Sequence, residues 1–171
     1  MPRLRCLSLL ILATALSGCA GYQLGGAKPT HLAGIQTVNV AIVQNDTQIP
    51  RAAAHATNTL IDALTQDGTY RLASVESADA RLITTLHKIE YRQARSTRID
   101  ILRSEELKMK VYLKWSLVDA DTPGKILASG QSRGTTRFFV DPNLQTARQT
   151  ALVDALKRAS ESVISRLADG F

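Results

Sequence analysis

"LKMKVYLKWSLVD" (residues 107–119) alternates apolar and polar side chains with the two-residue period of a β-strand. One face of this strand is apolar and consists of Leu107, Met109, Val111, Leu113, Trp115 and Leu117. The other face carries Lys108, Lys110, Tyr112 and Lys114. This alternation is typical of an antiparallel sheet that packs one face on the core and leaves the other in water. The stretch therefore predicts a sheet covered by helices on one side, with Trp115, the sole tryptophan, buried beneath a helix.

The residues that follow predict the second arm of a hairpin. "ADTPG" (120–124) has the composition of a turn, and "KILASGQSRGTTRFFV" (125–140) returns as a second strand. Most positions expected to face inward on this strand are small: Ile126, Ala128, Gly130, Ser132, Gly134, Thr136 and Phe138. A centre made of small residues would let a helix approach the sheet closely.

Three more strands are expected, at residues 35–43, 69–74 and 80–93. The turn residues of "QNDTQIP" (44–50) are expected to end the first of them. Alternation in the strand at 80–93 slips near His87, which indicates a bulge or a solvated strand end.

Two helices are expected from apolar residues spaced three and four apart. The first covers residues 51–67 and is closed by Gly68. The second runs from about residue 141 to 168 and begins with Asp141 and Pro142, an N-cap and first-turn signature. The expected fold class is α+β, with two helices packed on one face of a four- to five-stranded mixed sheet.

The N-terminal residues predict a lipoprotein signal peptide. Arg3 and Arg5 precede an apolar run at residues 6–16, which is too short to span a membrane. The run leads into "LSGC" (16–19), the leucine–small–small–cysteine order of a bacterial lipobox. Cys19 is therefore expected to be the lipidated first residue of the mature protein. The alternative is that Cys19 is a small apolar residue of a signal peptide that is cut elsewhere.

This interpretation divides the chain into a signal peptide at 1–18, a lipidated tether at 19–34 and a single α+β domain at 35–171. Ala20 stands where an aspartate would retain a lipoprotein in the inner membrane of enterobacteria, which favours the outer membrane. The only other cysteine, Cys6, would be removed with the signal peptide. We therefore expect neither a disulfide within the chain nor a cysteine-based metal site.

Catalytic signatures are absent from the sequence. The three histidines, His31, His55 and His87, do not have the spacing of metal ligands, and no nucleophile-elbow, phosphate-loop or zincin motif occurs. Asp119 and Asp121 flank a predicted turn, where aspartate is favoured for its geometry. We expect a protein that is not an enzyme and has no cofactor, no metal and no nucleic-acid partner.

Basic residues provide the positive signal, on a chain of 171 residues with a formal net charge of +6. Arg95, Arg98 and Arg103 are expected at the tip of a hairpin. Lys108, Lys110, Lys114, Arg133 and Arg137 are expected to line the open sheet face behind that tip. These residues are either solvated side chains that protect a sheet from pairing with another, or a binding surface for an anionic partner. Lipopolysaccharide phosphates, peptidoglycan acids and acidic protein surfaces are the candidate anions.

The order of several motifs resembles the LptE family of lipopolysaccharide-assembly lipoproteins from Gram-negative outer membranes. The motifs are "LSGCAGYQLGG", "VNVAIVQNDTQIP", "TNTLIDALTQDGTYRLAS" and "DARLITTLHKIEYRQ", followed by the C-terminal helix. The resemblance implies two helices against a four-stranded sheet. It also implies a non-enzymatic plug inside the LptD β-barrel, which binds lipopolysaccharide through basic residues and helps to place it in the outer leaflet.

Two other functions are compatible with parts of the sequence. One is a lipoprotein activator of a peptidoglycan synthase. Such a protein also begins with a strand that ends in a turn like "VAIVQNDT" (40–47), but its tether is usually long. The tether expected here has about 15 residues and reaches at most about 50 Å. A small periplasmic hydrolase is disfavoured because the sequence lacks a nucleophile constellation.

Overall fold

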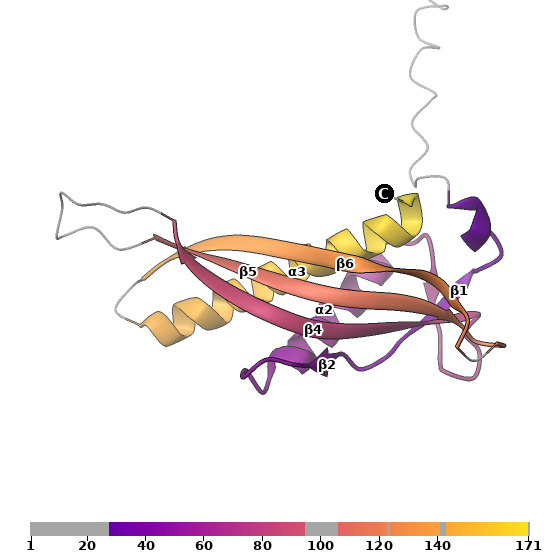
Figure 1. Cartoon of the computed structure of the whole chain (residues 1–171), viewed down its shortest axis with the longest axis horizontal. Helices are drawn as coiled ribbons and strands as arrows, with labels where there is room; N and C mark the ends of the chain where they lie inside the picture. The colour runs from indigo at the N-terminus through magenta and orange to yellow at the C-terminus, as the bar shows by residue number, and fades with distance from the viewer. Residues whose placement is uncertain (1–27, 95–105, 123, 141–142, 171) are drawn as a thin grey trace, which may run out of the picture.

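Three long antiparallel strands form the body of the molecule (Figure 1): β4 (Ala80–Gln93), β5 (Glu106–Asp119) and β6 (Ile126–Phe139). The computed structural model describes residues 28–94, 106–122, 124–140 and 143–170. Each long strand has 14 residues, which corresponds to a length of about 45 Å. The strand at 80–93 has the predicted bounds, and its register shifts between Leu86 and Lys88, so the slip near His87 is a β-bulge.

Three short strands complete the sheet on the β4 side: β1 (Thr37–Val40), β2 (Gln44–Asn45) and β3 (Arg71–Leu72). The strand order is β3-β1-β4-β5-β6, and β2 also pairs with β4. Pairs of β1 with β3 and β4 are parallel, whereas the long strands pair antiparallel. The predicted mixed sheet of an α+β fold is therefore confirmed, with β2 as an additional strand.

The strand expected at 35–43 is interrupted before it reaches its predicted end. The backbone N–H of Val43 donates to the Thr57 hydroxyl instead of to a neighbouring strand. The chain then pairs again with β4 at Gln44 and Asn45, which were expected to belong to a turn. That expectation was wrong because the contact with Thr57 displaces the chain from the sheet only locally.

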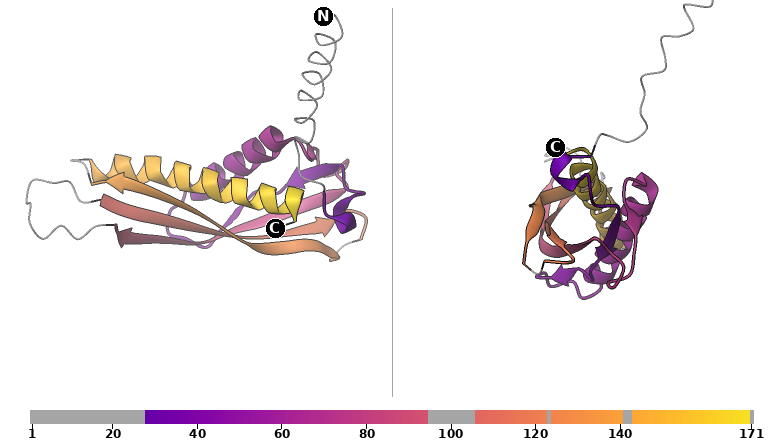
Figure 2. Two further views of the ribbon diagram at one scale, coloured as in Figure 1. Left: turned by 90° about the horizontal axis from the view of Figure 1, so that it is seen from above. Right: turned by 90° about the vertical axis from the view of Figure 1, so that its right-hand side faces the viewer.

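Both helices lie on the same face of the sheet (Figure 2): α2 (Ala52–Asp67) and α3 (Leu144–Asp169). Helix α2 ends at Gly68, whose φ of 74° is the left-handed conformation expected of a helix-closing glycine. Helix α3 packs on β6 and β5, and α2 packs against α3. The predicted arrangement of two helices on one sheet face is confirmed.

The start of α3 differs from the sequence prediction. Its N-cap is Asn143, whose side-chain oxygen accepts a hydrogen bond from the Thr146 N–H at 3.2 Å. The helix therefore begins after Asn143 and not at Asp141, because Asn143 satisfies an N–H group of the first turn. Asp141 and Pro142 themselves lie outside the described residues.

The core lies between the sheet and the two helices. The inward residues Met109, Val111, Leu113 and Leu117 of β5 are fully buried, and Trp115 is 7% exposed. Trp115 donates its indole N–H to the Ser132 hydroxyl at 3.2 Å. A Cβ added at Gly134 would collide with the Ala155 backbone, so α3 rests directly on the sheet at this glycine. The expected close approach of a helix over the small residues of β6 is confirmed.

One inward position on β6 was predicted incorrectly. Val118 pairs with Ile126, and Leu117 pairs with Ala128, so Leu127 is an extra residue in a β-bulge. The bulge reverses the facing of the strand end: Ile126 is 61% exposed, and Leu127 packs against the core. The five inward positions from Ala128 to Thr136, and Phe138, keep the predicted face.

The residues before β1 pack on the domain. A short 3-10 helix, η2 (Thr30–Leu32), places Leu32 in the core, where it is 1% exposed. The Lys28 ammonium donates to the Ile35 carbonyl and lies 4.6 Å from the centre of the Tyr70 ring. The packed part of the chain thus includes the last residues of the stretch expected as a tether. Within the described residues, none of the helices has the length and apolar character needed to cross a membrane.

Candidate functional site

Seven of the basic side chains on the sheet face opposite the helices form a cluster, which we call the basic face. Its residues are Lys88 and Arg92 of β4, Lys108, Lys110 and Lys114 of β5, and Arg133 and Arg137 of β6. They share a face because paired residues on neighbouring strands project to the same side of a sheet. Since neither helix covers this side, the charged groups can meet an external partner (Figure 2).

Strand register arranges these residues in rows across the sheet. Lys108 pairs with Arg92 on one side and Arg137 on the other, so three cations form one row. In another row, Tyr112 lies between Lys88 and Arg133. Directly opposed side chains have Cβ atoms about 4.5–5.5 Å apart. A rigid sheet therefore holds several positive charges within reach of one multiply charged anion.

Two acidic side chains lie among the described residues of this face, Glu90 and Glu106. Glu90 contacts the Lys88 ammonium at 2.6 Å and the Arg92 guanidinium at 3.9 Å, and it accepts a hydrogen bond from Tyr112 at 3.2 Å. The hydrogen bond from Lys88 is the largest cause of a lowered Glu90 pKa. Glu106 lies 3.8 Å from the Arg137 guanidinium. The acids therefore orient part of the basic face and leave its net charge positive.

Neighbouring like charges destabilise a sheet by a few tenths of a kcal/mol or more per pair. The row of Arg92, Lys108 and Arg137 places like charges directly opposite one another. Among the described residues, only its two outer members contact an acid, Glu90 and Glu106 respectively. Lys108 and Lys110 are of intermediate exposure, and a lysine on such a surface can lay its methylene stem along the sheet while its ammonium stays in water. The arrangement is suited to binding phosphate groups, which arginine meets with two hydrogen bonds and lysine with a point charge.

The structure brings together five of the eight basic residues that the sequence singled out for lipopolysaccharide binding. Lys108, Lys110, Lys114, Arg133 and Arg137 all lie on the basic face. The other three, Arg95, Arg98 and Arg103, lie outside the described residues, as does the lipidation candidate Cys19.

Sequence reasoning did not assign Lys88 and Arg92 to this face. The bulge at His87 hid them, because it interrupts the alternation that shows which way each side chain points. The sequence does contain a signal for them, because a new alternation begins after the bulge: Lys88, Glu90 and Arg92 alternate with Ile89 and Tyr91.

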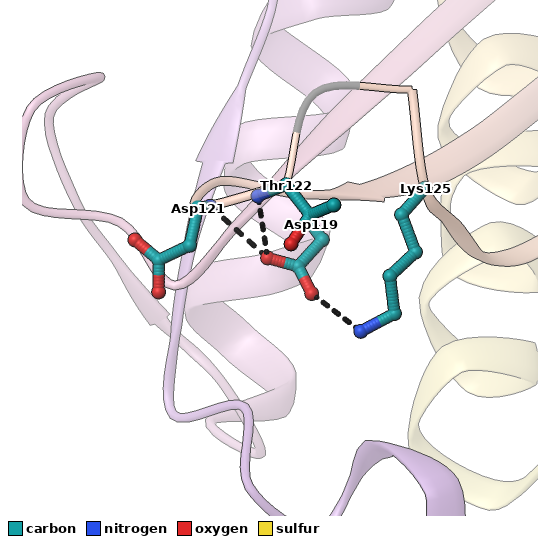
Figure 3. Close-up of polar contacts among 4 residues, drawn as sticks. All are labelled: Asp119, Asp121, Thr122 and Lys125. Atoms are coloured by element: carbon teal, nitrogen blue, oxygen red, sulfur yellow. Dashed lines mark hydrogen bonds and ion pairs between the residues drawn. The ribbon is translucent and has the colours of Figure 1, made fainter.

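The aspartates that flank the β5–β6 turn serve its geometry (Figure 3). The Asp119 carboxylate accepts hydrogen bonds from the N–H groups of Asp121 and Thr122 at 3.0 and 3.3 Å. It also accepts one from the Lys125 ammonium at 2.9 Å, the largest cause of its lowered pKa. A carboxylate held in this way caps the turn, which is the role that the sequence predicted for it.

Histidines do not assemble a metal centre in the described part of the chain. The His87 imidazole lies 3.7 Å from the Asp46 carboxylate at the bulge in β4. Within residues 28–94, 106–122, 124–140 and 143–170, no group of three or more histidine, cysteine, aspartate or glutamate side chains could hold a metal ion.

The family model of lipopolysaccharide assembly, LptE, matches residues 35–167. The chain belongs to the LptE family. This confirms the resemblance inferred from the motif order, and the match spans the complete sheet and most of α3. No curated protein sequence matches the chain.

Three solved structures resemble this LptE-family chain at low sequence identity. A protein from Xanthomonas campestris aligns with a TM-score of 0.53 and 12% identity over 83% of this chain and 89% of that protein. A minor lipoprotein from Acinetobacter baumannii aligns with a TM-score of 0.51 and 8% identity over 77% and 91%. The PelC dodecamer from Paraburkholderia phytofirmans aligns with a TM-score of 0.42 and 17% identity over 79% and 93%. At these identities, the first two likenesses show a shared fold.

Proposed function

We propose that the protein is an outer-membrane lipoprotein, lipid-anchored at Cys19, that binds lipopolysaccharide on its basic face. In this proposal it acts as the plug and assembly partner of an LptD-like β-barrel and helps to place lipopolysaccharide in the outer leaflet. The role is one of binding and assembly without catalysis. The observation that carries the proposal is the row of Arg92, Lys108 and Arg137 on a sheet face that no helix covers, in a chain of the LptE family.

The chemistry of lipopolysaccharide fits this face. Its phosphates are clustered, whereas a single exposed ion pair contributes little and is screened by salt. Several cations on one sheet can act together, because the strand register fixes their backbone positions before a ligand binds. Tyr112 adds a hydroxyl and an aromatic ring between Lys88 and Arg133.

The geometry also separates the proposed anchor from the binding surface. Helix η2 lies at the end of the sheet where β5 turns into β6, and the row at Lys108 lies toward the opposite end (Figure 1). Nine residues lead from Cys19 to Lys28, which reach at most about 30 Å. The domain would therefore stay close to its membrane, which supports a barrel partner over a peptidoglycan-synthase partner deeper in the periplasm.

Charge reversal on the basic face tests the binding function. We expect Lys108→Glu/Lys110→Glu to weaken binding to purified lipopolysaccharide roughly tenfold or more, and wild-type binding to fall as salt rises. The matched control is Lys157→Glu/Arg158→Glu on α3, which changes the net charge equally and affects exposed residues on the helical side. Circular dichroism should show that both double variants are folded. Equal affinities of the two variants would show that the basic face does not bind lipopolysaccharide.

Two further measurements test the anchor and the partner. Mass spectrometry of the mature N-terminal peptide should find acylated Cys19, and an unmodified Cys19 would refute the anchor. A pull-down of the acylated protein in mild detergent should recover a large β-barrel protein. Recovery of a penicillin-binding protein instead would favour the alternative function, activation of a peptidoglycan synthase.

A further inference from the structure

A hollow of about 300 Å³ lies at the end of the molecule away from the row at Lys108. Residues from three parts of the chain line it: Pro29, His31 and Leu32 near η2, Trp115 and Ser129 of the sheet, and Arg166 of α3. Figure 1 shows why they meet, because the C-terminal end of α3 lies beside η2. Pro29 and Gly170 are close enough that a Cβ added at Gly170 would lie 3.0 Å from the proline ring.

The lining combines an apolar floor with basic side chains. Trp115 has already donated its indole N–H to Ser132, so the ring offers only carbon atoms to the hollow. Pro29 extends this apolar surface, and Leu32, which is 1% exposed, lies beneath it. Arg166, in the last turn of α3, and His31 are both exposed, so they can meet an anion at the mouth. An anionic head above a short apolar segment matches these contacts.

We propose that this hollow binds an anionic phospholipid of the membrane that holds the chain, with the phosphate at Arg166 and His31 and the first acyl methylenes against Trp115. The inference rests on the lipid anchor of the proposed function. The number of residues between Cys19 and the hollow identifies this occupant. The wall of the hollow begins at Pro29, ten residues after Cys19, so an acylated Cys19 holds the hollow within about 35 Å of a bilayer.

Charge and aromatic chemistry support the same occupant. Basic residues near an anionic membrane surface strengthen its attraction to a protein, and tryptophan favours the interface between lipid and water. A lipid bound here would hold the end of the domain with the hollow at the membrane surface where Cys19 is anchored, with the row at Lys108 toward the opposite end of the domain. The hollow would then orient the domain, and the basic face would bind lipopolysaccharide.

The experiment uses Trp115 as an internal probe, because it is the only tryptophan of the chain. The mature acylated protein is reconstituted into phosphatidylcholine vesicles that contain brominated phosphatidylglycerol, with bromine on the acyl chain near the head group. We expect the Trp115 emission to be quenched at a lower mole fraction of brominated phosphatidylglycerol than of brominated phosphatidylcholine. Arg166→Gln should raise the mole fraction for half-maximal quenching about fivefold, as expected for one basic residue at an anionic surface. Lys157→Gln on the same helix, outside the hollow, should leave it unchanged.

The experiment distinguishes a failure of the proposed lipid site from a failure of the proposed anchor. Equal quenching by the two brominated lipids, or equal quenching in wild type and Arg166→Gln, would show that the hollow does not recognise the anionic head group. Protein that floats with the vesicles but whose Trp115 is not quenched would refute the inference and leave the anchor intact. Protein that does not float with the vesicles would refute the anchor at Cys19 and this inference together. Lipopolysaccharide binding through Lys108 and Lys110 is measured separately and depends on neither result.

Discussion

Odd-numbered residues of β5 pack beneath the helices, whereas even-numbered residues face away from them. On the packed side, Met109, Val111 and Leu113 are fully buried. On the open side, Lys108 and Lys110 keep their charged ends in water, next to other cations. One strand thus obeys two different constraints. The volume and shape of the core limit which side chains fit on the packed side, whereas charge decides which side chains suit the open side. Substitutions on the packed side should therefore affect folding, and those on the open side should affect binding.

Trp115→Ala should have the largest effect of the substitutions considered. It removes the largest side chain of the packed side and should destabilise the protein by about 3–5 kcal/mol. Tyr112→Ala on the open side of the same strand is the comparison, and should cost about 1 kcal/mol with its hydrogen bond to Glu90. Chemical denaturation of both variants measures the difference. Similar losses would contradict the division of β5 into a packed and an open side.

Gly134→Ala tests the contact between α3 and the sheet. The added methyl group would collide with the Ala155 backbone, which cannot move unless the helix moves. We expect a loss of roughly 3 kcal/mol, at the upper end for overpacking. The control is Gly130→Ala, whose methyl group would meet a side chain, the Trp115 ring at 2.8 Å, and no helix backbone. A denaturation midpoint lower for Gly130→Ala than for Gly134→Ala would be inconsistent with direct packing of α3 on Gly134.

Thr84→Val examines a polar group on the packed side. Thr84 is 1% exposed, and its hydroxyl has no hydrogen-bond partner within the described part of the chain. Valine has a similar shape and removes the unsatisfied hydroxyl, so we expect stability to rise by up to about 1 kcal/mol. Thr57→Val serves as a control, since the Thr57 hydroxyl bonds to Val43 and Ala53 and its loss should destabilise. A destabilised Thr84→Val variant would indicate that the hydroxyl has a partner in solution.

Lys108→Glu should separate stability from binding on the open side. It replaces a cation between Arg92 and Arg137 with an anion. Opposite charges across strands are favourable, so we expect stability to rise by a few tenths of a kcal/mol, while lipopolysaccharide binding weakens. Thermal denaturation and a binding assay on one preparation measure both effects. A variant that is less stable and binds as wild type would reverse the role assigned to this row.

The smallest expected effect is a shift of the Glu90 pKa, which can be measured by pH titration. Its folded-state pKa is below the ordinary value of 4.5, with the hydrogen bond from Lys88 as the largest cause. A lowered pKa means that its contribution to stability is present above about pH 4.5 and is lost as pH falls through the folded-state pKa. In an NMR titration, Lys88→Ala should move the Glu90 pKa upward more than Arg92→Ala does. A larger shift in Arg92→Ala would identify the wrong main partner.

Much of the fold could be predicted from the sequence because its signals are local. The alternation of β5 is visible in the residues themselves, the slip near His87 indicated a bulge or a solvated strand end, and Gly68 closes α2 where a helix cap was expected. The incorrect predictions lie where nearby residues compete for the same structural role. Asn143 caps α3 ahead of the Asp141 signature, and the bulge at Leu127 turns Ile126 outward. Several arrangements were compatible with the local residue types in these places, and packing selected one of them.

The candidate site could be predicted only in part. Lys108, Lys110 and Lys114 were assigned to one face because they lie on one regular strand. Whether Lys88 and Arg92 belong to the basic face depends on the register of β4 after its bulge. The alternation before the bulge does not predict that register. The hollow at Trp115 could not be predicted, because Pro29, Trp115 and Arg166 are far apart in the sequence and meet only in the folded chain.

By itself, the sequence determined which residues prefer apolar surroundings and which face of β5 carries charge, and it contains the "LSGC" order that predicts a lipobox ending in Cys19. These properties depend on neighbouring residues and on the two-residue period of a strand. The tertiary structure decided which cations share a row and how closely α3 approaches Gly134. The physical reason is that strand register and helix contact join residues distant in sequence, and a shift of one residue moves a side chain to the opposite face of the sheet.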